Sequence, residues 1–130
     1  MVVPKRVVVK RGDESAEIAV AEVATGDVIA DASPAWTRTL REGIADAKTV
    51  LWNGPLGNYE AGFREGSVVL AELIADSTAY SIVGGGDTLA VINELGLSDQ
   101  FSFVSTGGGA MLDFLASGTL PGIAALRSGE

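Results

Sequence analysis

The sequence predicts an α/β fold in which a short β-rich segment precedes a partial parallel sheet with flanking helices. From residue 48 onward, short apolar runs alternate with stretches of helical periodicity. That alternation is typical of a parallel sheet with helices packed on its faces. Two of the strand–helix units carry a triple glycine at the turn. Residues 1–31 lack the alternation and form a β-rich lead-in instead.

The lead-in predicts two short strands and is followed by a helix. KRVVVKR (5–11) and EIAVAEV (17–23) are apolar runs, and residues 12–15 between them have a turn composition. Ser33 suits the N-cap of a helix and Pro34 suits its first position. The apolar residues that then recur every three or four positions are Trp36, Leu40, Ile44 and Ala47.

The later elements alternate along the chain. Strands are predicted for KTVLWN (48–53), AYSIVG (79–84) and FSFVS (101–105). Helices are predicted for residues 64–76, 87–95 and 109–118. Gly96 and Gly118 suit the ends of the last two helices. The predicted core is therefore a partial Rossmann-like sheet.

Composition excludes several classes of function. The net charge of −8 argues against nucleic acid, whose binding rests on neutralised phosphates. No apolar run approaches the roughly 20 residues of a membrane span, and the start does not resemble a secretory signal, so we expect no membrane partner. The chain has neither Cys nor His. Disulfides, thiolate metal sites, histidine-ligated zinc and a Ser-His-Asp triad are therefore impossible, and we expect a cytoplasmic protein.

The two triple glycines form what we call the first glycine turn (residues 84–86) and the second glycine turn (residues 107–109). Because parallel strands end at the same edge of a sheet, we expect the turns to lie at the carboxyl edge, where open α/β sheets bind ligands. Glycine lets backbone N–H groups approach an anion closely, and a helix N-terminus adds unpaired donors. The alternative is that these glycines only permit tight turns.

Asp87 directly follows the first glycine turn, where its charge would repel a phosphate. None of the nine Lys and Arg residues lies in either turn, so a bound polyphosphate would need a cation. Mg²⁺ typically takes one or two carboxylates together with phosphate oxygens. Asp87 is therefore a candidate ligand for a magnesium–nucleotide. The alternative is that Asp87 is the N-cap of the following helix, and the two roles are compatible.

Neither glycine turn fits a common nucleotide fingerprint. In the pattern G-x-G-x-x-G/A the last position is Leu89 when counted from Gly84, and Leu112 when counted from Gly107. Neither turn contains the lysine of the phosphate-binding P-loop. These mismatches weigh against a dinucleotide-dependent oxidoreductase, which is a third function that an α/β fold of this size could serve.

A third segment, TVLWNGPLGNYEAGF (49–63), ends a strand and continues into a glycine-containing loop. Its pattern LWNGPLG…E, followed by GGGDT and STGGGA, closely resembles phosphoglycerate kinase in order and spacing. The ending LASGTLPGIAAL resembles the C-terminus of that family. The resemblance is strong over residues 48–126 and weak before them. It implies that residues 1–130 form a single partial domain, the last part of the family's nucleotide-binding domain.

The resemblance implies phosphoryl transfer between 1,3-bisphosphoglycerate and Mg-ADP in glycolysis, which yields 3-phosphoglycerate and Mg-ATP. Asn53 would lie near the phosphate and sugar of the nucleotide, Glu60 would hydrogen-bond the ribose hydroxyls, and Asp87 would help to bind Mg²⁺. The residues implied to line the phosphates are Gly84, Gly85, Gly86, Asp87 and Thr88. The catalytic positions, which open a helix aimed at the transferring phosphoryl group, are Gly107, Gly108 and Gly109.

The sequence departs from the family pattern in two segments. Asn58-Tyr59 replaces an apolar-aromatic pair, and DASPAW (31–36) differs from Asp-Ile-Gly-Pro-x-Thr at Ser33 and Trp36. The family's N-terminal domain, which binds phosphoglycerate, and the nucleotide-binding lysines are absent from these 130 residues. The chain resembles the last third of the enzyme. We therefore expect phosphoglycerate to bind only with the missing domain present, and the chain alone to be inactive.

A second interpretation from another class is a non-catalytic module, derived from the same fold, that binds a nucleotide or a partner chain. In either case the lost neighbouring strands would leave a sheet edge exposed. An open edge invites pairing with another chain, so we expect a homodimer through that edge.

Overall fold

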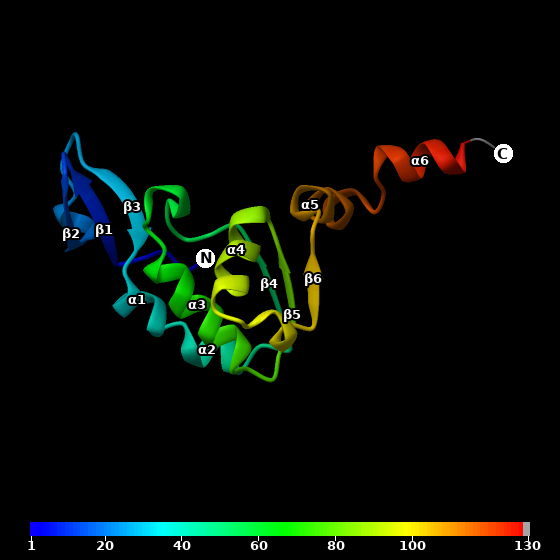
Figure 1. Cartoon of the computed structure of the whole chain (residues 1–130), viewed down its shortest axis with the longest axis horizontal. Coiled ribbons are helices and arrows are strands. Elements are labelled where there is room, and N and C mark those ends of the chain that lie inside the picture. Colours follow the sequence, from blue (N-terminus) through cyan, green and yellow to red (C-terminus); the bar gives the residue numbers. More distant parts are fainter. Residues whose placement is uncertain (129–130) are drawn as a thin grey trace.

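The computed structural model describes residues 1–128, which contain two three-stranded sheets. The first is antiparallel, with the order β2-β1-β3, and lies at one end of the molecule (Figure 1). Its strands are β1 (Arg6–Arg11), β2 (Glu14–Ala19) and β3 (Val28–Ala32). The predicted β-rich lead-in is therefore confirmed, with a third strand added at its end.

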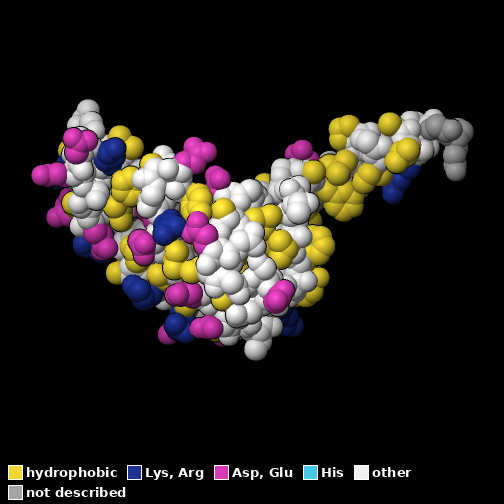
Figure 2. Space-filling model, viewed as in Figure 1, with side chains coloured by type: hydrophobic (Ala, Val, Ile, Leu, Met, Phe, Trp, Pro, Cys, Tyr) yellow, Lys and Arg dark blue, Asp and Glu magenta, His cyan; other side chains and the backbone are white. Residues whose placement is uncertain are grey.

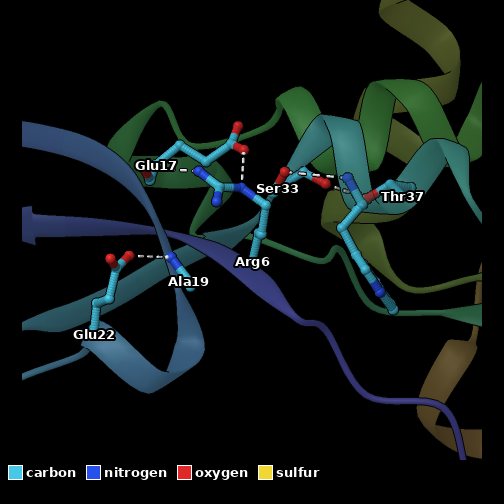
Figure 3. Close-up of polar contacts among 7 residues, drawn as sticks. Arg6, Glu17, Ala19, Glu22, Ser33 and Thr37 are labelled. Carbon is cyan, nitrogen blue, oxygen red and sulfur yellow. Dashed lines mark hydrogen bonds and ion pairs between the residues drawn. The ribbon is translucent and has the colours of Figure 1, made fainter.

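The second strand of the lead-in lies about three residues earlier than its apolar run. It begins at Glu14, within the predicted turn, and ends at Ala19, and residues Val20–Glu22 form a 3-10 helix, η1. The Glu22 carboxylate accepts a hydrogen bond from Ala19 N at 2.8 Å (Figure 3). This local bond from a side chain to the backbone curls the chain away from the ladder, so the prediction of a strand through residue 23 is wrong.

The predicted helix after Ser33 is split into α1 (Pro34–Arg38) and α2 (Arg41–Ala45). Ser33 is the N-cap, since its Oγ accepts from Trp36 N at 3.1 Å, and Pro34 is the first helical residue, as predicted. The interruption lies at Thr39, whose hydroxyl donates to Trp36 O at 2.7 Å. Because this bond competes with the helical ladder, the apolar periodicity continues across a break in the helix.

The second sheet is parallel, as predicted, and its strand order is β4-β5-β6. Its strands are β4 (Thr49–Asn53), β5 (Tyr80–Gly84) and β6 (Phe103–Ser105). Helices α3 (Glu65–Ala75) and α4 (Gly86–Glu94) cover one face, and short 3-10 helices, η2 (Tyr59–Ala61) and η3 (Ser98–Gln100), lie in the connections. The core between this face and the two helices comprises Trp52, Leu70, Ala71, Ile74, Val83, Val91, Ile92 and Phe101.

The last two helices leave the body of the molecule. α5 (Gly108–Ser117) begins at the sheet edge and ends at Gly118, which has φ +72° and closes the helix as predicted. α6 (Pro121–Arg127), which was not predicted as a helix, extends the chain farther outward (Figure 1). No single helix within residues 1–128 is long and apolar enough to cross a membrane, although the bent pair α5–α6 passes that test of length and composition when taken together.

Within residues 1–128, no helix layer like that of α3 and α4 covers the other face of the parallel sheet. Leu51, Ile82 and Phe103 stand in register across the three strands, so their side chains share this face. Leu51 is 44% exposed and Phe103 is 52% exposed. Parallel sheets are normally buried on both faces, so this apolar row is unusual for an isolated chain.

Candidate functional site

The carboxyl ends of the three parallel strands meet at one edge of the sheet. Asn53 pairs in register with Gly84, and Gly84 pairs with Ser105. α4 begins two residues after β5, and α5 begins three residues after β6. The prediction that the two glycine turns lie at the same carboxyl edge is therefore confirmed.

Three of the six glycines are required by the contact between the two turns. A β-carbon on Gly84 would lie 3.1 Å from Gly108 Cα and 2.8 Å from Met111 Cε. A β-carbon on Gly108 would collide with Gly85 N and lie 2.6 Å from Asn53 Oδ1. Gly85 also has φ +96°, a backbone conformation that favours glycine. The tight-turn interpretation therefore accounts for Gly84, Gly85 and Gly108.

The other three glycines border open space. A β-carbon on Gly86 or Gly109 would meet no atom within 4 Å, and one on Gly107 would meet only Ala110 Cβ at 3.7 Å. None of these three has a positive φ. Packing among the described residues therefore does not require glycine at these positions. The space over Gly86 and Gly109 is where a ligand could approach the backbone closely.

Both helices that begin here present backbone N–H groups without helical partners. In α4 the first helical hydrogen bond runs from Leu89 N to Gly85 O at 2.9 Å, and in α5 from Met111 N to Gly107 O at 2.8 Å. The N-cap residues, Gly85 and Gly107, offer no side-chain acceptor. The N–H groups that precede these first helical bonds belong to Gly86, Asp87 and Thr88 in α4 and to Gly108, Gly109 and Ala110 in α5.

Asn53 and Thr88 tie the strand ends together. The Asn53 amide Nδ2 donates to Gly108 O at 3.4 Å, which links β4 to the second glycine turn. Thr88 is fully buried, and its Oγ1 accepts from Gly54 N at 2.9 Å, which links α4 to the end of β4. The structure thus brings both predicted residues to the glycine turns, and gives both of them bonds within the chain that fix the geometry of the edge.

Asp87 is the second residue of α4 and is exposed to solvent. The alternative in which Asp87 caps the helix is wrong, because the N-cap is Gly85 and no side-chain cap hydrogen bond forms. Asp87 stabilises α4 instead through its charge in the first turn, near the positive end of the helix dipole. Among residues 1–128 no group of three or more acidic side chains could hold a metal ion. Any ion at Asp87 would therefore take its remaining ligands from elsewhere.

Glu60 lies apart from the glycine turns in the hydrogen-bond pattern. It is an exposed residue of η2, whose N-cap Asn58 accepts from Ala61 N through its Oδ1 at 3.2 Å. No hydrogen bond or ion pair in the described part of the chain joins Glu60 to either glycine turn. The loop that carries Glu60 is held instead by contacts with the end of α4.

That loop is tied to the far end of α4 by a polar cluster that the sequence did not predict. The Tyr59 hydroxyl donates to Glu94 Oε1 at 2.6 Å, and Arg64 pairs with the same carboxylate at 2.6 Å. The bond to Glu94 also raises the pKa of Tyr59. These residues are distant in sequence, so only a tertiary contact reveals them.

Comparison with known proteins identifies related chains. The family model for phosphoglycerate kinase matches residues 1–118. The structure is similar to that of phosphoglycerate kinase from Coxiella burnetii, with a TM-score of 0.81 and 40% sequence identity over 97% of this chain. It is also similar to phosphoglycerate kinase from Pyrococcus horikoshii OT3, with a TM-score of 0.81 and 34% identity over 95% of this chain.

Two features of these matches refine the expectations from sequence. The family match spans residues 1–118, so it includes the residues before 48 and ends before residues 119–126, the last part of the segment in which the resemblance was expected to be strong. The chain covers 33% of the Coxiella protein and 32% of the Pyrococcus protein, and thus spans about a third of the length of the solved structures that it matches.

Proposed function

The chain belongs to the phosphoglycerate kinase family, and we propose that its two glycine turns form part of the Mg-nucleotide site of an enzyme that transfers a phosphoryl group between 1,3-bisphosphoglycerate and ADP. One observation carries the proposal. α4 and α5 begin side by side at the carboxyl edge of the sheet, and both present unpaired backbone N–H groups beneath the open space over Gly86 and Gly109.

The phosphates of ADP or ATP would bind at these N–H groups. Each exposed helix N-terminus stabilises an anion by roughly 0.3–1 kcal/mol, and two termini aimed at one polyphosphate act together. The residues proposed to line the phosphates are Gly84, Gly85, Gly86, Asp87 and Thr88. The second turn, Gly107, Gly108 and Gly109, would face the transferring phosphoryl group, where preorganised donors stabilise charge that develops in the transition state.

Mg²⁺ fits the carboxylate of Asp87 at this edge. Asp87 is exposed at the start of α4, and none of the three ion pairs found in residues 1–128 involves it. Mg²⁺ commonly takes one carboxylate together with phosphate oxygens and water, and when bound it would offset phosphate charge that no basic residue of the turns neutralises. Asp87 thus belongs in this site as a charged group, which explains an acid in a place where a phosphate alone would be repelled.

The proposal gives different tasks to Asn53 and Glu60. Asn53 donates a hydrogen bond to Gly108 O, so it would fix the position of the second glycine turn beside the phosphates and sugar of the nucleotide. Glu60 has no hydrogen bond within the described residues that competes for its carboxylate, and it would accept hydrogen bonds from the ribose hydroxyls. Both tasks require the loop after β4 to stay fixed relative to α4.

The proposal also covers phosphoglycerate binding, binding partners and cellular location. Phosphoglycerate would bind only with a further domain, because the glycine turns carry no basic residue that would hold a second anion. The 130-residue chain alone would therefore bind Mg-nucleotide without turnover. We also propose a cytoplasmic location, no nucleic-acid or membrane partner, and a homodimer formed through the exposed edge of the parallel sheet and the uncovered face beside it.

The substitution Asp87→Asn tests the metal part of the site. It should weaken ADP binding in Mg²⁺ by roughly ten- to a hundredfold, because a contact with a charged group contributes roughly 1.5–3 kcal/mol. Binding without Mg²⁺ should stay nearly unchanged or improve, because a repulsive charge has been removed. Calorimetric titration of ADP with and without Mg²⁺ measures both affinities.

Asp99→Asn is the matched control, because Asp99 is exposed in the first turn of η3, away from the sheet edge. It should leave both affinities unchanged. Equal losses with and without Mg²⁺ in Asp87→Asn would contradict the metal role and leave Asp87 with its helix-dipole role alone.

A further inference from the structure

Asp31 is an acidic side chain enclosed by the protein, with only 2% of its surface exposed. It lies on β3, and its Oδ2 accepts a hydrogen bond from Gly66 N at 3.0 Å. Gly66 is in the first turn of α3, whose own N-cap residue, Arg64, provides no side-chain cap. Asp31 therefore supplies from another element the acceptor that the start of α3 lacks.

The second carboxyl oxygen of Asp31, Oδ1, is buried and has no hydrogen-bond partner among the described residues. It lies between two glycines, since a β-carbon on Gly57 or on Gly66 would be 2.6 Å from Oδ1. The β-carbon position on Gly66 is also 2.7 Å from Ala32 O, and the position on Gly57 collides with Phe63 O. Oδ1 thus shares its surroundings with two carbonyl oxygens, which only accept hydrogen bonds.

An ionised carboxylate suits this place poorly. A bare anionic oxygen that is removed from water and lies near carbonyl dipoles is costly, whereas a proton on Oδ1 would supply the missing donor. Burial is the largest influence and raises the pKa of Asp31. The backbone N–H groups of Gly66 and Ala32 lower it, and the charge of Glu65 raises it again.

Two of the residues beside Asp31, Gly57 and Phe63, belong to the segment of residues 54–64, which carries Glu60. On one side of this segment Leu56 N donates to Ser67 Oγ at 2.8 Å, and on the other Asn58 N donates to Ala30 O at 2.8 Å. The segment is therefore held between β3 and α3, and Asp31 lies at the junction of the two.

We propose that Asp31 is a positioning residue for the nucleotide site, whose carboxyl group, protonated on Oδ1, fastens the segment of residues 54–64 to the start of α3. The proposal rests on the proposed function only for the step from this segment to the ribose contact of Glu60. The clamp itself belongs to the chain without any ligand, so it can be tested separately.

The first test is the pH dependence of unfolding. Burial in the folded chain raises the pKa of Asp31 above its ordinary value of 3.8. The contribution of Asp31 to stability is therefore fully present below pH 3.8. That contribution is lost as the pH rises through the folded-state pKa. Asp31→Asn should not show this loss, since its amide keeps an acceptor for Gly66 N–H and places a donor near the carbonyl oxygens. Urea unfolding of both chains from about pH 2 to pH 8 compares the two profiles.

Asp27→Asn is the control with the opposite sign. Hydrogen bonds from Arg11 lower the pKa of Asp27 to about 2, so its contribution is present above pH 3.8 and is lost as the pH falls toward 2. The variant should change the acid limb of the profile and leave the loss above pH 3.8 intact. A wild-type profile without that loss, or an Asp31→Asn chain that unfolds at lower urea than wild type at pH 7, would overturn the protonated clamp.

The second test separates the clamp from the nucleotide. Asp31→Ala should speed hydrogen exchange of the Leu56, Asn58 and Gly66 amides by about tenfold, while Asp31→Asn keeps them protected at the same pH. Mg-ADP affinity should fall several-fold in Asp31→Ala and return in Asp31→Asn. Equal exchange in both variants would overturn the clamp. Faster exchange in Asp31→Ala with unchanged ADP affinity would overturn the positioning role. A wild-type chain that binds no ADP would refute the proposed function, and the exchange rates alone would then test the clamp.

Discussion

At the scale of single residues, the six glycines of the two turns look alike in sequence but serve different purposes. Gly84, Gly85 and Gly108 are small because the turns touch, and Gly85 also needs its positive φ. Gly86 and Gly109 have free space around them. A large side chain at Gly108 would therefore damage the packing of the site, so that position cannot report on ligand approach by itself.

Gly109→Ala tests ligand approach without a packing defect. The added methyl group meets no atom of the described chain, and replacing glycine within a helix normally stabilises by roughly 0.5–1 kcal/mol. We expect unchanged or higher thermal stability together with Mg-ADP binding weakened by about tenfold, because the methyl group occupies space needed by a phosphate. Thermal unfolding and calorimetry measure the two effects.

Gly43→Ala is the matched control, because Gly43 lies within α2, also has no atom within 4 Å of an added β-carbon, and is remote from the glycine turns. It should match Gly109→Ala in stability and match wild type in ADP affinity. Normal affinity in Gly109→Ala would show that no ligand approaches the second glycine turn at this residue.

Sequence reasoning reached the glycines and Asp87 because their chemistry depends on neighbours along the chain. Its alternative role for Asp87, the N-cap, was wrong by two positions, since the N-cap is Gly85 and the helix begins at Gly86. It could not find the roles of Asp31 or Glu94, whose partners lie 35 and 30 residues away. The available signal was weak: one acidic residue in an apolar strand, with glycines in the segments that later pack around it.

At the scale of elements, periodicity predicted the strands β4 and β5 and the helices α3, α4 and α5 to within one or two residues, because each buries a regular pattern. It missed the break between α1 and α2, where the Thr39 hydroxyl competes for Trp36 O. It also placed the start of β6 two residues early. Phe101 is buried as a core residue, but its backbone lies outside the ladder, which pairs only residues 103–105 with β5.

The uncovered face of the parallel sheet is the element-scale feature with the clearest consequence. Its apolar row of Leu51, Ile82 and Phe103 continues toward α5, where Met111 and Phe114 line a further open hollow beside Phe103. At the free edge of β4, Val2 lies near Leu51 around a second apolar hollow. Exposed apolar surface of this kind marks interaction sites.

We predict that the chain self-associates through this face, and that Phe103→Lys reduces the association. The substitution should weaken association because burying the lysine charge in an apolar interface is costly. Sedimentation velocity over a range of concentrations measures the change. Val28→Lys is the control, since Val28 is 61% exposed on β3 in the other sheet. A wild-type chain that stays monomeric at high concentration would contradict the prediction, as would equal effects of the two variants.

At the scale of the whole molecule, the chain has three parts along its length. The antiparallel sheet lies at one end, the parallel sheet with its helices lies in the middle, and α5 and α6 form an arm at the other end (Figure 1). Hydrophobic side chains gather on the arm, whereas most charged side chains lie over the other two parts (Figure 2). The exposed apolar residues of the arm include Leu112, Phe114, Leu115 and Leu126.

The central claim is that the amides at the starts of α4 and α5 hold the phosphates of a Mg-nucleotide. The most direct measurement is an amide NMR titration of the 13.3 kDa chain with Mg-ADP. We predict that the largest shifts fall on the N–H groups of Gly86, Asp87, Gly108, Gly109 and Ala110, and that they weaken when Mg²⁺ is removed. Shifts confined to other parts of the chain, or no saturable shift at either helix start, would contradict the account.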